Sequence, residues 1–264
     1  MLKNLSVPLA FLFSVPTFAQ PRPTLDCNHR GGQNRASFCE MREQSVAGGS
    51  MLSVDASQNG GISIKGWDRS DILVRSQVST YAPTDGEARN LALQIIVQTT
   101  GSDIRANGPT RDNDHQWAVS YEIFVPSRFS VNLVTENGGV SISDVVGNLE
   151  LKTVNGGLAL HRVGGYVHGN TTNGGITIEL AGDRWEGQGL DVTTTNGGVH
   201  LRMPRNYSAQ LEAQTSSGGI HVADIAEPPQ QQRSTGHHIS TALGAGGALL
   251  KVTTTNGGVS LSRI

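Results

Sequence analysis

An aliphatic residue recurs at every second position after each of seven related turn sequences, six reading Asn-Gly-Gly and one Ser-Gly-Gly. Counting from the Asn, or from Ser217 in the sixth copy, residues +3 and +5 are always aliphatic, as in Val140 and Ile142. The residue between them is polar, small or histidine. This period of two predicts a strand with one face buried after each turn.

A second alternating segment precedes six of the turns. Positions −6 and −4 are small or aliphatic, and position −2 is always threonine, as in Val131, Leu133 and Thr135. Three turns follow one another at intervals of 18 residues, and Val145-Val146-Gly147 and Val163-Gly164-Gly165 repeat at the same interval. One unit therefore consists of two strands and two turns, with insertions in the later copies.

The Asn-Gly-Gly residues are the candidate structural residues of the chain. Glycine adopts positive φ at no steric cost and asparagine tolerates it, so we expect a tight reversal of the backbone at each copy. The predicted turn residues are Asn59, Gly60, Gly61, Asn137, Gly138, Gly139, Asn155, Gly156, Gly157, Asn173, Gly174, Gly175, Asn196, Gly197, Gly198, Gly218, Gly219, Asn256, Gly257 and Gly258.

Two all-β architectures fit this pattern. In a single-stranded β-solenoid, similar to a β-helix, each unit is one coil and equivalent residues stack on those of the next coil. In an antiparallel β meander, each Asn-Gly would instead be a hairpin turn. A meander would expose a wide aliphatic face, and no amphipathic segment after residue 130 could cover it. The pattern therefore favours the solenoid.

We expect an irregular arm over residues 20–45 and a solenoid domain over residues 46–264. Within that domain, residues 46–130 form an N-terminal sheet and cap, and residues 131–264 form the coils. Thr84 and Glu87 have the spacing of a capping box, which predicts a short helix that caps the open sheet end. Residues 227–238 are predicted to form a loop that is rich in proline and glutamine over residues 227–232.

Residues 1–19 have the pattern of a secretory signal peptide. Lys3 precedes an apolar stretch, and Thr17-Phe18-Ala19 supplies small residues for cleavage. We therefore expect export, with the protein periplasmic, on the cell surface or extracellular, and no membrane span in the mature chain. The only two cysteines, Cys27 and Cys39, are expected to form a disulfide in that oxidising compartment.

The composition narrows the possible partners. The chain has 20 basic and 22 acidic residues, a formal net charge of −2 and only 5% aromatic residues. There is no basic patch for nucleic acid. With few aromatic rings, the core must consist mainly of β-branched and aliphatic side chains, which suit sheets.

Several motifs together resemble the bacterial exported putative-adhesin family. They are Ile62 to Asp68 with its Gly-Trp-Asp turn, Ile72 to Val74, Tyr121 to Pro126 before the coils, Gly244 to Gly247, and the last Asn-Gly-Gly strand. The resemblance covers residues 46–264. It implies a β-solenoid related to autotransporter adhesin heads, in a domain of unknown function.

Candidate metal ligands are few. His200 and His221 share position +4 in what the sequence presents as successive coils, so they would stack on the outer face. Two imidazoles alone are a weak metal site, and Glu179 and Glu212 fall at other positions. His237 and His238 lie in the loop. We expect all of these side chains to be solvated, with no metal and no other cofactor.

Other surface chemistry is also sparse. Thr193, Thr195, Thr253 and Thr255 resemble ice-binding Thr-x-Thr arrays, but Asn170, Gln214 and Ser216 interrupt the series. Stacking on a sugar ring is one use of tryptophan, and Trp185 is the candidate for it, because Trp67 and Trp117 adjoin strands where packing is the commoner use.

No row of carboxylates suggests a glycosidase or lyase, so an enzyme is not expected. The sequence favours an exported, non-enzymatic binding or scaffold module, an adhesin-like protein whose partner is an envelope protein or a polysaccharide. The alternatives are a polysaccharide-acting β-helix enzyme and a purely structural envelope spacer.

Overall fold

The computed structural model describes residues 25–27, 35–223 and 233–264. The predicted signal peptide, residues 20–24 and 28–34 of the predicted arm, and residues 227–232 of the predicted loop lie outside the described residues.

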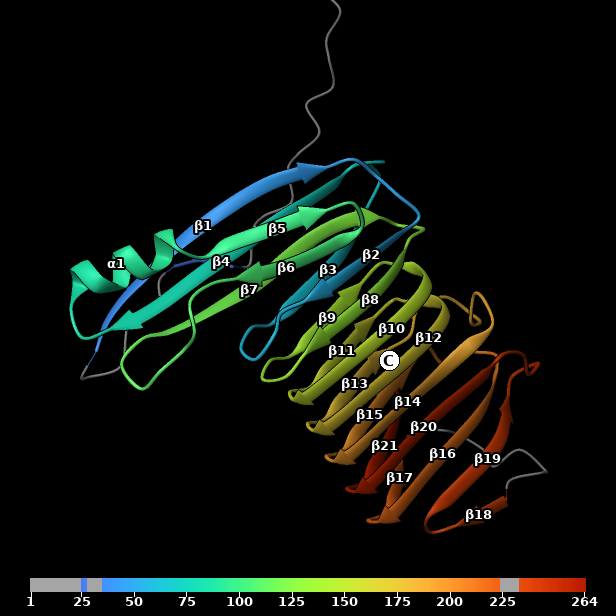
Figure 1. Ribbon diagram of the computed structural model, residues 1–264. Helices are drawn as coiled ribbons and strands as arrows, with labels where there is room; N and C mark the ends of the chain where they lie inside the picture. Colours follow the sequence, from blue (N-terminus) through green and yellow to red (C-terminus); the bar gives the residue numbers. More distant parts are fainter. Residues whose placement is uncertain (1–24, 28–34, 224–232) are drawn as a thin grey trace, which may run out of the picture.

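Two sheets face each other along the solenoid (Figure 1). The ten strands of sheet A are, in spatial order, β1 (Ala36–Val46), β4 (Ile72–Ala82), β7 (Gln116–Pro126), β3 (Ile62–Trp67), β9 (Val140–Ser143), β11 (Leu158–His161), β13 (Ile176–Glu179), β15 (Val199–Met203), β21 (Val259–Arg263) and β17 (Ile220–Val222). The eleven strands of sheet B are β18 (Arg233–Thr235), β19 (His238–Leu243), β16 (Ala209–Ser217), β20 (Leu249–Asn256), β14 (Gly189–Asn196), β12 (Gly164–Asn173), β10 (Val146–Asn155), β8 (Ser130–Thr135), β2 (Met51–Asp55), β6 (Asp103–Asn107) and β5 (Ile96–Thr100).

The coils are parallel and in register, so the β-solenoid is confirmed and the meander is wrong. Leu149 of β10 pairs with Val167 of β12, and Leu158 of β11 pairs with Ile176 of β13, each 18 residues apart. Antiparallel pairing is confined to the ends, in β1–β4–β7, β5–β6 and β16–β19–β18.

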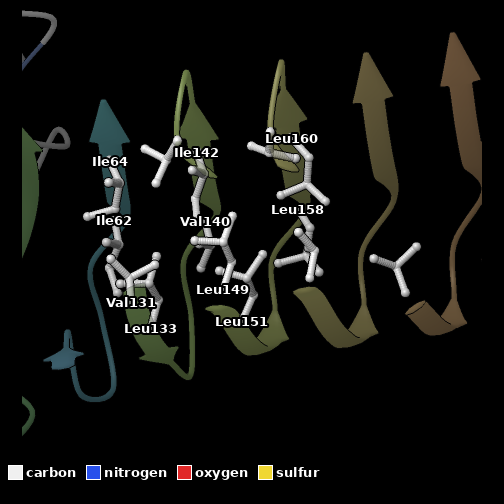
Figure 2. Packing of buried hydrophobic residues seen from close by; sticks show 14 of the residues in the cluster. Ile62, Ile64, Val131, Leu133, Val140, Ile142, Leu149, Leu151, Leu158 and Leu160 are labelled. Carbon is white, nitrogen blue, oxygen red and sulfur yellow. The ribbon is translucent and has the colours of Figure 1, made fainter. Parts of the chain in front are cut away.

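The aliphatic rows lie between the sheets, as the period of two predicts. Figure 2 shows Val140 and Ile142 beside Leu158 and Leu160, with Leu149 and Leu151 contributed by the opposite sheet. All six side chains are at most 2% exposed. Burial of these rows is the main favourable term for the fold, because each side chain leaves water on folding.

The threonine at position −2 connects each turn to the neighbouring coil. Thr153 Oγ1 donates to the carbonyl oxygen of Gly138 at 2.9 Å, and Thr171 Oγ1 donates to that of Gly156 at 2.7 Å. The same bond links Thr135, Thr194, Thr215 and Thr254 to Gly60, Gly174, Gly257 and Gly197. These threonines are buried, so each hydroxyl has a partner where water is excluded.

The asparagines of the turns form a ladder of side-chain amides. Asn155 Nδ2 donates to Asn137 Oδ1 at 2.7 Å, and Asn173 donates to Asn155 at 2.8 Å. The ladder begins at Asn59 and continues through Asn196 to Asn256. Each side-chain amide is therefore hydrogen-bonded to the amide of the neighbouring coil, which favours stacking of the coils in register.

The prediction that glycine is needed in these turns for positive φ is wrong for most copies. Among the Asn-Gly-Gly and Ser-Gly-Gly glycines, positive φ occurs only at Gly60 and Gly218, at 159° and 150°. In the second turn, left-handed φ falls instead on Asp144 and Arg162, at 61° and 51°.

Close approach of the backbone requires the first glycine of each turn. A Cβ at Gly156 would lie 2.0 Å from the carbonyl oxygen of Gly138, and one at Gly138 would lie 2.1 Å from that of Gly60. Each of these turns joins a strand of sheet B to a strand of sheet A, as between β10 and β11, whereas a hairpin would join neighbours in one sheet. Each turn also lies against the turn of the neighbouring coil.

The spatial order of the last coils differs from their order in the sequence. The coil of β20 and β21 lies between the coil of β14 and β15 and the coil of β16 and β17. Asn256 thereby extends the amide ladder from Asn196, and Ser217 is placed at its end. The outer side of β16 pairs with β19, which ends the run of parallel strands.

The N-terminal end contains the predicted helix and one strand that the sequence did not predict. In α1 (Asp85–Leu93), Thr84 and Glu87 form the capping box, and Ala88, Leu91 and Ala92 are buried. The helix packs on β4 and β1. The prediction of an irregular arm up to residue 45 is wrong for 36–45, because β1 pairs along its whole length with β4.

Replacing Gly138 by alanine should lower the free energy of unfolding by about 3 kcal/mol, because its Cβ would overlap a backbone carbonyl that cannot move away. Gly139→Ala is the matched control, since its Cβ would lie 3.6 Å from the nearest atom. Urea denaturation of both variants measures the difference. Equal stabilities would contradict the nesting of the turns.

Replacing Thr171 by valine should lower the free energy of unfolding by about 1–2 kcal/mol, because the carbonyl of the half-buried Gly156 loses its donor at nearly constant side-chain volume. Thr172→Val on the outward face should change it by less than about 0.5 kcal/mol. Thermal unfolding of the pair checks this, and a similar loss in both variants would show that the bond contributes nothing.

Candidate binding surface

The outer face of sheet B carries a row of polar side chains that crosses the coils. Neighbouring strands place these residues directly opposite one another, about 4.8 Å apart. In spatial order the row consists of Asn132, Glu150, His168, Asp191, Lys251 and Glu212. We call these six residues the polar row. All of them are exposed or half-buried.

An aromatic ring lies beside the polar row. Tyr166 of β12 pairs with Gly189 of β14, which pairs in turn with Leu249 of β20. Tyr166 is 43% exposed and Leu249 is 42% exposed. Gly189 must be glycine, because a Cβ there would lie 2.5 Å from the carbonyl oxygen of Leu249. Gly189 itself is buried, so the exposed apolar surface here belongs to Tyr166 and Leu249, and we call the three residues the Tyr166 platform.

The electrostatic character of this face is mixed. Lys251 stands between the carboxylates of Asp191 and Glu212, and His168 stands between those of Glu150 and Asp191. His238 Nε2 of β19 lies 3.7 Å from Glu212 Oε1. Because acids and bases alternate, the face has both donors and acceptors for neutral hydroxyl groups and no strong field of one sign.

The sequence did not single out this surface. Tyr166, Gly189 and Leu249 all stand seven residues before the turn asparagine, which is an outward position in the alternation. An exposed aromatic residue at an outward strand position was the signal available. Their juxtaposition could not be predicted, because it depends on β20 lying next to β14.

The two Thr-x-Thr strands are neighbours, contrary to the sequence order. Thr193 pairs directly with Thr253. Gln214 lies on the far side of β20 and Asn170 on the far side of β14. The interruption predicted between the threonine strands is therefore wrong, although Asn170 and Gln214 limit the array to these two strands.

The histidines are not brought together on sheet A. His200 and His221 both pair with Ser260, which lies between them on β21. The prediction that they stack as neighbours is wrong, because the last coil separates theirs. Glu179 instead accepts from Arg202 Nη1 at 3.2 Å. His237 is exposed, and no group of three potential metal ligands occurs in the described parts of the chain.

The tryptophans contribute mainly to packing. Trp185 is 6% exposed and its indole N–H donates to the carbonyl oxygen of Gly165 at 3.0 Å, so its face is not available to a sugar ring. Trp117 is equally buried and bonds to Pro109. Trp67 stacks on Phe124, with ring centroids 5.5 Å apart.

A depression of about 470 Å³ at the second turns is lined by paired charges. Arg162 Nε donates to Asp144 Oδ1 at 2.6 Å, and this bond raises the pKa of Arg162. Arg184 Nε contacts Asp183 Oδ1 at 3.2 Å. Tyr207 also lines the depression, and burial, with a smaller effect of Asp183, raises its pKa to about 12.

Cys27 and Cys39 form a disulfide, with Cα atoms 5.5 Å apart. Cys39 lies on β1, and Gln77 Nε2 of β4 donates to the carbonyl oxygen of Asp26. The bond therefore fastens the segment at 25–27 to sheet A.

Comparison with known proteins places the chain in a family. A family model described as Toastrack DUF4097 matches residues 50–262. No curated protein is significantly similar in sequence. Within the described residues, no helix has the length and apolar character that a membrane span requires.

Three solved structures are similar to this chain over most of its length. A putative cell adhesion protein from Clostridium sporogenes is 11% identical, with a TM-score of 0.48 and coverage of 86% of this chain and 100% of that chain. A putative adhesin from Bacteroides fragilis is 9% identical, with a TM-score of 0.39 and coverage of 85% and 97%. A putative adhesin from Parabacteroides merdae is 8% identical, with a TM-score of 0.31 and coverage of 86% and 96%.

Stability should fall between about pH 10 and pH 12 in part through Tyr207. Its pKa is raised from 10.0 in the folded state, so folding favours the neutral phenol, and this contribution is complete below pH 10 and lost as pH rises to about 12. In the Tyr207→Phe variant, the free energy of unfolding should fall by about 2 kcal/mol less over this pH range than in the unsubstituted protein. Denaturation of both proteins from pH 8 to pH 12 tests this, and parallel curves would contradict it.

Proposed function

Because the chain belongs to the Toastrack DUF4097 family and carries a flat face with an exposed aromatic ring, we propose that it is an exported, non-enzymatic binding module for an envelope polysaccharide. The Tyr166 platform beside the polar row is the observation that carries this proposal.

The Tyr166 platform suits the apolar face of a sugar ring. Aromatic rings bind such faces by dispersion and burial of C–H groups, and the phenol hydroxyl of tyrosine stays in water. Tyr166 and Leu249 present exposed apolar surface on strands that both pair with β14 at Gly189. Gly189 has no side chain that would stand between a bound ring and these two residues.

The polar row suits the hydroxyl groups of the same ligand. Carboxylates accept two hydrogen bonds from neighbouring hydroxyls, and Lys251 and His168 supply donors. These residues repeat at the spacing of the strands, along one direction of a rigid sheet. A polymer of sugars could therefore make similar contacts on successive coils.

Export rests on two supports. Residues 1–19 have the pattern of a signal peptide, and the Cys27–Cys39 disulfide requires an oxidising compartment. Both observations support a periplasmic, cell-surface or extracellular location for the mature protein.

The alternatives predict different surfaces. A polysaccharide-acting enzyme requires an acid and a base, or a metal, beside the bound sugar. A structural spacer requires no ligand at all. The exposed Tyr166 ring near the exposed Leu249 favours a binder over a spacer, because grouped apolar side chains on a surface are typical of an interaction site and a spacer does not need one.

The test is binding of the intact chain to an array of bacterial polysaccharides, followed by calorimetry with each ligand found. Tyr166→Ala should weaken binding at least about tenfold, because the stacked ring is lost. Tyr166→Phe should retain it, since the ring remains. Lys251→Ala should weaken binding to a smaller extent.

His161→Ala on the outer face of sheet A is the control and should have no effect. Absence of binding to every polysaccharide would favour the spacer, and chemical change of the ligand would favour the enzyme. Binding that Tyr166→Ala leaves unchanged would place the site elsewhere.

A further inference from the structure

The two sheets are unequal in width at the N-terminal end. Beyond the coil of β2 and β3, sheet A continues through β7, β4 and β1, whereas sheet B continues only through β6 and β5. At this end, within the described residues, sheet B therefore continues through one strand fewer than sheet A, and β1 extends past the edge of sheet B.

The helix covers only part of the exposed face of β1. Thr80 Oγ1 of β4 donates to the carbonyl oxygen of Ala88, and Arg42 of β1 donates to those of Ala92 and Ile95 at 2.9 and 2.6 Å. The helix ends at Leu93, so the part of β1 from Arg42 to Val46 extends past it.

A depression of about 250 Å³ lies where the absent strand of sheet B would run. Gln44 of β1, Val74 and Ser76 of β4, and Ile95, Ile96 and Val97 at β5 line it, together with Arg42 and Glu43. Both charged side chains already have partners, because Arg42 donates to Glu40 and to two carbonyl oxygens and Glu43 accepts from Arg75. Val97 packs against the core but is only partly buried, and a strand added beside β5 would cover it.

The edge of β5 is unprotected in comparison with the other three sheet edges. β1 carries Glu40, Arg42 and Glu43, and β17 and β18 are three residues long. β5 has five residues without a charge or a proline, and Ile96 is 60% exposed. Charges, short strands and proline normally block pairing at an edge.

From these observations we infer that β5 is a docking edge that accepts an extended segment of a partner protein as an additional strand of sheet B. The backbone of β5 supplies the hydrogen bonds, and alternate side chains of the segment enter the depression. The segment is about five residues long and uncharged, with small β-branched residues such as valine facing inward toward Val74 and Val97.

A second copy of this chain does not fit this edge by pairing of β5 with β5. An antiparallel pair would be related by a two-fold axis perpendicular to sheet B, and β1 of one copy would then occupy the place of β4 of the other. Because sheet A extends past β5, this edge can pair with a single extended segment but not with the β5 edge of a second copy. The inference does not depend on the proposed polysaccharide face, which lies over the later coils.

The probe is a blocked heptapeptide of alternating threonine and valine, added to the intact chain. Amide hydrogen exchange should slow by at least about tenfold at residues of β5 and remain unchanged in β16, with saturation as the peptide is added. A second peptide, methylated on alternate backbone nitrogens along one edge, should bind at least about tenfold more weakly, because it cannot donate to β5.

Two variants separate the docking edge from non-specific adsorption. Gln44→Trp places a large side chain in the depression and should reduce peptide binding at least about tenfold. Ser45→Trp, on the opposite face of the same strand, should bind as the unmodified chain does. No protection of β5 at saturating peptide, equal binding of the methylated peptide, or equal loss in both variants would overturn the inference.

Discussion

The close approach of successive Asn-Gly-Gly turns is the constraint on which the rest of the structure depends. Carbonyl oxygens lie where a Cβ would be, only 2.0–2.2 Å from its position at Gly138, Gly156, Gly174 and Gly197. This nesting fixes the separation of the coils. The threonine hydroxyls and the asparagine amides then bond across that separation, so turn, strand and core share one register.

The same register sets the chemistry of the surface. Once the inward rows are aligned, every outward side chain is aligned as well, because the side chains of a strand alternate between its faces. The polar row and the Tyr166 platform therefore consist of residues that are distant in sequence but adjacent in space. Their spacing belongs to the rigid sheet, so little conformational entropy would be lost on binding a ligand.

The nesting of the turns stops at both ends of the solenoid, and each end is closed in a different way. At the C-terminal end, β19 pairs antiparallel with β16 and ends the parallel run. At the N-terminal end, α1 packs on β4 and β1, and Arg42 donates to the carbonyl oxygen of Ile95. Sheet A extends beyond sheet B at this end. Unpaired backbone at an end of a repeat structure must be covered or bound. The disulfide from Cys39 fastens the chain to the strand that forms this overhang.

The sequence alone determined the coil, its 18-residue length, the inward residues and the capped helix, because these depend on local alternation and on short-range hydrogen bonds. It did not determine β1, whose residues 36–46 do not alternate clearly and become a strand only by pairing with β4. Nor did it determine the position of the last coil, since the Asn256 turn resembles every other turn in composition. That position decides the separation of His200 from His221 and the meeting of Tyr166, Gly189 and Leu249. Only the tertiary structure could decide it, because the choice among equivalent neighbours depends on the amide ladder and on the pairing of β16 with β19.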